Sequence, residues 1–195
     1  MKTAFTIAAL GLAATVPSIA LAQQAPAAVI VVVDSDRIYR ECTACRTAQA
    51  GLQSRVAGLT TRQQTLTTQL RTEGQPIEAA IRALNGAQPD AALRARVTAF
   101  QTKQEKANQE LASTQENIRS IQANVLRQIN ARLNPAITQV MAARGANLAV
   151  DVSNTLATSQ SVDATAAVLA ALNASLKTVT LTPLPASAQN QPSGR

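Results

Sequence analysis

The sequence predicts a predominantly α, α+β protein in which a long antiparallel helical hairpin projects from a small β-containing oligomerisation body. Apolar residues recur at alternating steps of four and three through two long stretches, as they do in coiled coils. Turn-forming residues separate these stretches, and short β-branched or apolar runs flank them. Aromatic residues make up only 2% of the 195 residues, so a single thick globular core has little bulky material.

The amino terminus has the three-part pattern of a secretory signal peptide. Lys2 precedes an apolar run over residues 4–16, and the small residues Ala20 and Ala22 complete the pattern. The run is short for a membrane span, which makes an uncleaved anchor the less favoured alternative. We therefore expect residues 1–22 to be a signal peptide cleaved after Ala22, and the mature protein to be exported to the periplasm.

The charge balance narrows the classes of partner. Without the signal peptide the mature chain has a net charge of about +6, which favours acidic or anionic partners. Export and the lack of aromatic residues for base stacking argue against nucleic acid. Acidic polypeptides, lipopolysaccharide phosphates and anionic membrane surfaces remain as candidate partners.

We assign the body to residues 23–42 and 144–177, and two runs of residues within it predict its strands. Residues 29–33 are all β-branched and too few for a buried helix, and residues 148–152 form the second run. A short helix capped by Asp163 should follow, and residues 178–195 are expected to be a disordered tail. Because so small a sheet with an open edge needs further partners, the body should oligomerise through its strands. The residues expected at this interface are Val29, Val31, Val33, Leu148 and Val150.

Residues 43–143 are predicted to form the hairpin arm, with its tip near residues 85–90. Gly86 permits positive φ, Pro89 stops the helix, and Asp90 can cap the helix that follows. Several positions of the predicted apolar seam are polar, which indicates either register control or a loosely packed arm. These positions are Gln63, Glu73, Gln104 and Thr114.

A bend is expected in the first helix near the tip. Pro76 lacks the backbone N–H that would bond to the carbonyl four residues earlier, and Gly74 relaxes the backbone beside it. The sequence therefore predicts an arm that can bend near its distal end.

The residues that could carry chemistry are few. Cys42 and Cys45 form a CxxC motif, but no thioredoxin-like βαβ pattern surrounds them, so a structural or incidental pair is favoured over a redox site. The chain has no histidine, which excludes a Ser/His or Cys/His nucleophile and leaves a zinc site half empty. Helix capping accounts for Asp34 and Asp36. We expect no enzymatic activity, cofactor or metal.

At both ends the sequence resembles the Skp/OmpH family, from about Val29 to Asn173. Residues 30–39 are similar to the family's first strand and the helix start that follows it. Residues 146–151 resemble its returning strand, and residues 161–173 resemble its closing helix. The coil between these segments is not specific, since heptads occur in many proteins. The CxxC pair departs from the family, because it occupies the turn before the long helix.

The resemblance implies a homotrimer in which three hairpins surround a cavity that holds unfolded outer-membrane β-barrel proteins without ATP. It thus implies a periplasmic holding chaperone that prevents aggregation of its clients. The alternatives are a coiled-coil envelope spacer and, less favoured, a CxxC thiol oxidoreductase. Basic residues keep the arms positive and are the expected client-binding positions: Arg55, Arg62, Arg71, Arg82, Arg94, Arg96, Lys103 and Lys106.

Overall fold

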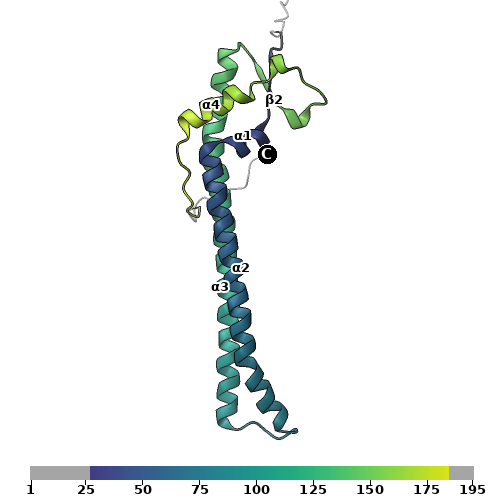
Figure 1. Ribbon diagram of the computed structural model, residues 1–195, viewed down its shortest axis with the longest axis vertical. Coiled ribbons are helices and arrows are strands. Elements are labelled where there is room, and N and C mark those ends of the chain that lie inside the picture. Colours follow the sequence, from purple (N-terminus) through teal and green to yellow (C-terminus); the bar gives the residue numbers. More distant parts are fainter. Residues whose placement is uncertain (1–26, 185–195) are drawn as a thin grey trace, which may run out of the picture.

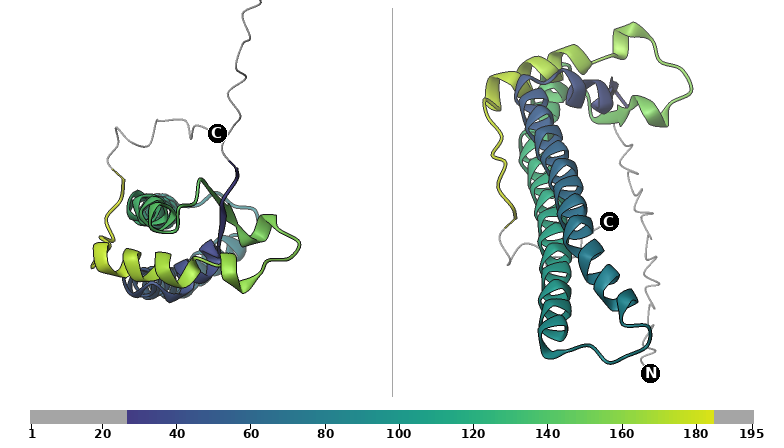
Figure 2. Two further views of the ribbon diagram at one scale, coloured as in Figure 1. Left: turned by 90° about the horizontal axis from the view of Figure 1, so that it is seen from above. Right: turned by 60° about the horizontal axis from the view of Figure 1, so that its bottom comes forward.

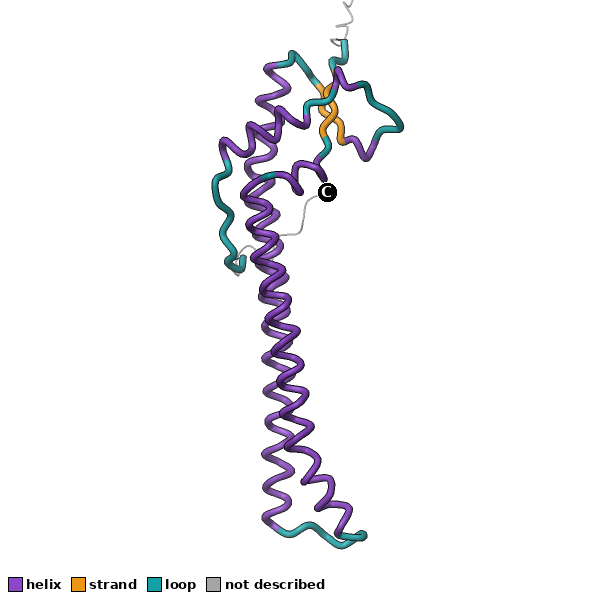
Figure 3. The backbone as a smooth tube through the Cα atoms, in the orientation of Figure 1, coloured by secondary structure: helices purple, strands orange, loops and turns teal. Residues whose placement is uncertain are grey.

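A small body and a long helical hairpin make up the structure, a computed structural model that describes residues 27–184 (Figure 1). Two helices form the hairpin, whereas short strands and helices gather at its base (Figure 3). This architecture confirms the predicted fold class. The predicted signal peptide, its cleavage site after Ala22 and the end of the predicted tail lie outside the described residues.

The hairpin consists of α2 (Thr43–Ala83) and α3 (Ala91–Ala143). Their 41 and 53 residues correspond to about 60 and 80 Å of helix. At the tip Asn85 and Gly86 both have positive φ, and the carboxylate of Asp90 accepts a hydrogen bond from the Leu93 amide at 2.7 Å. The predicted capping role of Asp90 is therefore confirmed.

The contact between α2 and α3 differs in detail from the predicted seam. Glu73 is exposed, and Gly74 is buried in its place, because the ring of Phe100 lies directly over Gly74. A Cβ atom at position 74 would come within 2.9 Å of the ring. Buried or half-buried positions on α2 thus run Leu66, Leu70, Gly74 and Ile77, with two successive steps of four, which locally unwinds a heptad coil.

The distal part of α2 diverges from α3 toward the tip (Figure 3). Pro76 lies inside α2 in this part of the helix and has no N–H to donate to the carbonyl four residues earlier. The missing bond lets α2 bend in this region, which gives a physical reason for the divergence.

The sheet of the body is parallel and very small. Strand β1 (Ile30–Val33) pairs with β2 (Leu148–Asp151), with Ile30 opposite Leu148. The other edge of β1 is covered, because the Ala164 amide donates to the Val32 carbonyl at 2.8 Å. Among the described residues, the outer edge of β2 is therefore the open edge of the sheet.

Helices α1 (Ser35–Glu41) and α4 (Thr165–Ser175) complete the body, and α4 packs against α3 and α1 (Figure 2). Two 3-10 turns, η1 (Val152–Asn154) and η2 (Gln160–Val162), lie in the loop between β2 and α4. The residues that fill the core between these elements include Val31, Val33, Ile38, Ile121, Val125, Ile129, Leu133, Val168 and Leu172.

Aspartates hold the ends of these short elements. Asp34 caps α1 by accepting from the Arg37 amide at 2.7 Å, as predicted. Asp151, at the end of β2, accepts hydrogen bonds from the hydroxyls of Ser153 and Ser35. These bonds lower the pKa of the Asp151 carboxyl to about 2, although partial burial opposes the shift.

The carboxyl-terminal segment differs from the expectation of disorder that we placed on residues 178–195. Residues 177–184, which we call the tail segment, lie against the base of the hairpin, and Val179 and Leu181 pack on the core. The Pro, Ser and Gln content of the stretch suggested disorder, but two apolar side chains and several main-chain hydrogen bonds hold the tail segment in place.

Candidate functional site

The eight basic residues predicted to bind clients all lie exposed on α2 or α3. Three of them are engaged within the chain: Arg62 pairs with Glu110 at 2.6 Å, Lys103 pairs with Glu73, and Arg55 donates to the Leu181 carbonyl at 3.2 Å. The other five have no ion pair with a described residue, and they lie mostly near the tip: Arg71, Arg82, Arg94, Arg96 and Lys106.

The two ion pairs join α2 to α3 along the arm. The guanidinium of Arg62 lowers the pKa of the Glu110 carboxyl, chiefly through its hydrogen bonds. Both partners are exposed, so the pair contributes little to stability, but it locally neutralises the surface. The positive charge available to a partner is consequently greater toward the tip than at the middle of the arm.

Apolar side chains are also exposed on the arm, separated along its length. Val56 and Ile81 on α2 and Leu126 on α3 are each about half exposed, at 50%, 45% and 46%. Leu126 borders a depression of about 300 Å³ where the arm meets the body, lined also by Tyr39 and Leu52. The arm therefore offers dispersed apolar contacts among charged and polar ones.

The structure separates the residues predicted to mediate oligomerisation into two groups. Val29 and Leu148 are exposed, at 46% and 45%, and Val150 is half-buried. Val31 and Val33 are instead buried inside the subunit core, at 3% and 4% exposure, so their side chains do not reach the surface. The side chains of a strand alternate between core and surface only if one face of the strand is open to solvent.

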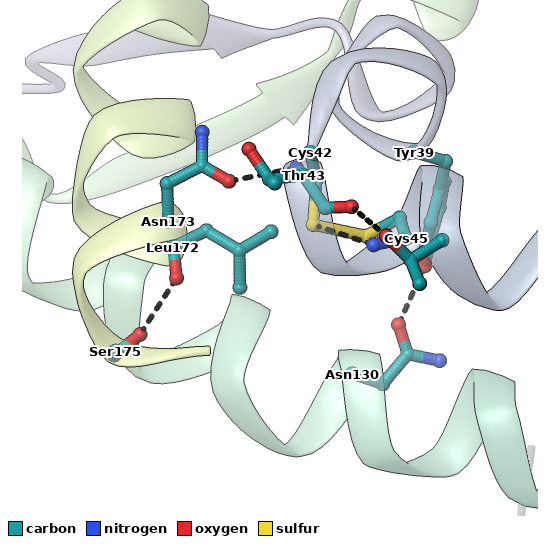
Figure 4. Close-up of a disulfide and its surroundings, with 9 residues drawn as sticks. Tyr39, Cys42, Thr43, Cys45, Asn130, Leu172, Asn173 and Ser175 are labelled. Carbon is teal, nitrogen blue, oxygen red and sulfur yellow. Dashed lines mark hydrogen bonds between the residues drawn. A yellow bond between two sulfur atoms is a disulfide. The ribbon is translucent and has the colours of Figure 1, made fainter. Parts of the chain in front are cut away.

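Cys42 and Cys45 form a disulfide between the end of α1 and the start of α2 (Figure 4). Leu172 and Asn173 of α4 lie beside it, and the Asn173 side chain accepts from the Thr43 amide at 3.0 Å. The two cysteines are 0% and 4% exposed. A buried disulfide in the core is out of reach of a protein substrate, as expected for a structural pair.

Sequence reasoning missed a row of polar side chains on α3. Ser120, Asn124 and Gln128, spaced by four residues, all form hydrogen bonds to the main chain of the tail segment. We call these three residues the polar ladder. The spacing of four was visible in the sequence, but each residue is common on exposed helix faces, and nothing local indicated a partner about 55 residues away.

Residues 27–184 hold neither a metal-binding cluster nor a membrane-spanning helix. They contain no cluster of three or more His, Cys, Asp or Glu side chains arranged to hold a metal ion. None of the helices described there is long and apolar enough to span a bilayer.

Comparison with known proteins identifies the fold. The structure is similar to the crystal structure of a protein from Caulobacter crescentus CB15 described as an OmpH-like outer membrane chaperone, with a TM-score of 0.68 and 20% sequence identity. The match covers 85% of this chain and 96% of that one. At this identity the similarity is evidence for the fold. No curated protein matches the chain.

The family assignment rests on the sequence as well. The model of the family described as Outer membrane protein (OmpH-like) matches residues 29–172, which include both strands, the hairpin and most of α4. The chain belongs to the OmpH-like family.

Proposed function

We propose that this protein is an ATP-independent periplasmic holding chaperone that binds unfolded outer-membrane proteins and prevents their aggregation. The observation that carries the proposal is the hairpin, which projects from the body and presents exposed cations and dispersed apolar side chains on one long surface. Membership of a chaperone family agrees with it.

Holding an unfolded chain requires many weak contacts and no catalytic group. Five exposed cations, with no ion pair to a described residue, can attract acidic segments of a client. Exposed apolar residues, such as Val56, Ile81 and Leu126, can then retain apolar segments. Contacts of this kind act together when several arms engage one client, because each bound arm raises the effective concentration of the others.

We further propose that the protein is a homotrimer joined through the body. The outer edge of β2 is open, and a two-stranded sheet is marginal by itself. The exposed residues Val29, Ile30 and Leu148 lie on or next to the strands, and Leu156 in the following loop is fully exposed. An apolar surface of this kind is typical of an interface between subunits.

Lipopolysaccharide phosphates and anionic membrane surfaces are additional proposed partners of the basic arm. A phosphate group on either would be attracted to the same exposed arginines that meet an acidic client. Competition between lipopolysaccharide and an unfolded client for the purified protein is the direct measurement.

The central test is to dilute a urea-denatured porin into buffer with and without the mature protein. We expect the protein to suppress light scattering and to form a soluble complex of defined stoichiometry without ATP. Scattering that is unchanged at a stoichiometric excess of the trimer would refute the proposed function. An envelope spacer would give that negative result, whereas a thiol oxidoreductase would reduce insulin.

A further inference from the structure

The arm binds the tail segment, residues 177–184, through hydrogen bonds to the main chain of that segment. The amide of Thr180 donates to the Gln128 side chain at 3.0 Å, and the Gln128 side chain donates back to the Thr180 carbonyl at 3.0 Å. Asn124 donates to the Thr182 carbonyl at 2.9 Å, and the Leu184 amide donates to the Ser120 hydroxyl at 2.9 Å. These four bonds use main-chain atoms of the tail segment, which every residue except proline supplies in full.

The spacing of these bonds requires an extended partner. Successive residues of the polar ladder are four apart on α3, a rise of about 6 Å, and they meet every second residue of the tail segment. Two residues of extended chain span about 6.6 Å, which matches the helical step closely. The tail segment runs antiparallel to α3, since Leu184 meets Ser120 and Thr180 meets Gln128. Such a row can therefore accept an extended, β-strand-like segment of many different sequences.

The alternate residues of the tail segment provide the apolar contacts. Val179 and Leu181 pack on the core. Leu181 also lies against Gly51 of α2, so close that a Cβ atom added to Gly51 would be 2.3 Å from the Cδ1 atom of Leu181. Arg55 of α2 also donates to the Leu181 carbonyl. From residue 178 to residue 182 the bound segment thus alternates, with threonine at each even position and an apolar residue at each odd one, and its main chain is held from both helices.

The same alternation occurs in transmembrane β-strands, as in other strands with one apolar face. Residues 178–182 read Thr-Val-Thr-Leu-Thr, and strands of outer-membrane barrels alternate apolar and polar residues with the same period of two. The tail segment also lies beyond residues 29–172, the part that matches the family. The role of the tail segment therefore rests on its own contacts and not on the family match.

We propose that the polar ladder and the surface around Gly51 form a binding site for extended, alternating segments of unfolded client, and that the tail segment is its internal occupant. The inference rests on the proposed function and adds to it the place and the chemistry of one contact. A client strand can replace the tail segment bond for bond, so the exchange leaves few buried polar groups without partners. The client strand must also replace the apolar contacts of Val179 and Leu181 as the tail segment leaves.

The first test measures the tail segment while a client is bound. Amide hydrogen exchange of Thr180 and Leu184, whose amides bond to the polar ladder, is followed in the full mature protein with and without a saturating unfolded porin. We expect both amides to exchange at least several-fold faster in the complex. The Ala164 amide, bonded to Val32 in the body, is the internal reference and should not change.

A soluble complex in which Thr180 and Leu184 exchange no faster would overturn the inference and leave the proposed function intact. Failure to form any complex would refute both.

The second test weakens the tail segment without altering the site. Leu181→Ala removes its apolar contact, and Thr178→Ala, at an exposed position of the same segment, is the matched control. Leu181→Ala should bind porin several-fold more tightly than the control. The bound tail segment is an internal competitor, and the apparent affinity for a client is proportional to the fraction of sites that the tail segment leaves open. Equal or weaker binding, with exchange at Thr180 shown to be faster, would mean that the tail segment is only a brace.

The third test weakens the site itself and should have the opposite sign. Gln128→Ala removes the side chain that both donates to and accepts from the main chain of Thr180. Gln139→Ala, at an exposed glutamine of the same helix, is the control. We expect Gln128→Ala to release the tail segment and yet to bind porin more weakly than Gln139→Ala. Tighter binding by Gln128→Ala would show that the freed surface, without the polar ladder, is what clients use, and would overturn the inference.

Discussion

Burial decides the role of the two cysteines at the scale of single residues. Cys42 is fully buried and Cys45 nearly so, and their disulfide joins α1 to α2 beneath α4. Cys42 also caps α2, because its sulfur accepts a hydrogen bond from the Cys45 amide at 3.3 Å. Both observations assign the pair to the stability of the body and not to chemistry on a substrate.

We therefore expect Cys42→Ala combined with Cys45→Ala to lower stability while leaving client holding intact. A disulfide that closes so short a loop contributes about 2 kcal/mol to the free energy of unfolding in the chain-entropy description. Alanine is preferred to serine because a hydroxyl at the fully buried position 42 would lose its hydrogen bonds to water. Chemical denaturation gives the stability, and porin aggregation gives the function. Loss of holding by a correctly folded and assembled variant would reinstate a role for the thiols.

Asp151 links stability to acid pH. Hydrogen bonds from the Ser153 and Ser35 hydroxyls, opposed by partial burial, lower its pKa from 3.8 to about 2 in the folded state. A depressed pKa means that this contribution is fully present above about pH 4 and is lost as the pH falls toward 2. We expect Asp151→Asn to be less stable than the native protein at pH 7, with the difference narrowing below pH 4. A difference that stays constant over this range, measured by urea unfolding, would contradict the assignment.

At the scale of elements, the distal arm has an irregular region in α2. Gly74 is buried beneath Phe100, Pro76 interrupts the hydrogen bonds of α2, and the two helices diverge from there to the tip. The irregularity lies next to the exposed arginines, so a bend here changes the position of the charged tip relative to the body.

Pro76→Ala should stiffen the distal arm. The substitution restores an amide that can donate to the Thr72 carbonyl and removes a helix penalty of up to about 3 kcal/mol. Amides of α2 near position 76 should then exchange more slowly. Gln75→Ala, an exposed neighbour that alters no backbone bond, is the control. If exchange near the tip is the same in both variants, proline is not what loosens the arm.

At the scale of the whole molecule, the proposed assembly through the open edge of β2 can be tested with a substitution at an exposed strand residue. Val31 is part of the subunit core, so a charge there would unfold the body before it revealed anything about subunit contacts. Leu148 is on the outer strand and 45% exposed. It is therefore the better position at which to separate assembly from folding.

Leu148→Asp should dissociate the proposed trimer while keeping the helix content of the subunit. Leu126→Asp on the arm is a closely matched control, since that leucine is 46% exposed and lies away from the sheet. Native mass spectrometry and circular dichroism report assembly and folding separately. An intact trimer of Leu148→Asp would argue against an interface through the strand edge.

Client encounter should depend on the cations of the distal arm. Reversing Arg94, Arg96 and Lys106 to Glu leaves the Lys103 pair with Glu73 and the apolar contact positions unchanged. Because exposed charges mainly tune association, stopped-flow capture of an unfolded porin should slow by about ten-fold at low salt and depend less on salt. An unchanged rate in a correctly trimeric variant would leave apolar contact as the main route of entry.

The sequence by itself determined the elements that depend on local chemistry. The hairpin follows from the repeated apolar steps, and its reversal from Gly86 and Asp90, because periodicity and capping act within a few residues. The first strand follows from a β-branched run and the second from a mostly apolar one, and the family follows from motifs near both ends of the matched region.

Only the tertiary structure decided which of these residues face one another. It buried Val31 and Val33 in the core and placed Gly74, in preference to Glu73, beneath Phe100. It also paired the polar ladder of α3 with the tail segment, about 55 residues further along the chain, which composition alone suggested to be disordered. Contacts between distant segments depend on the relative placement of whole helices, and that placement is set by packing across the molecule and not by any local pattern.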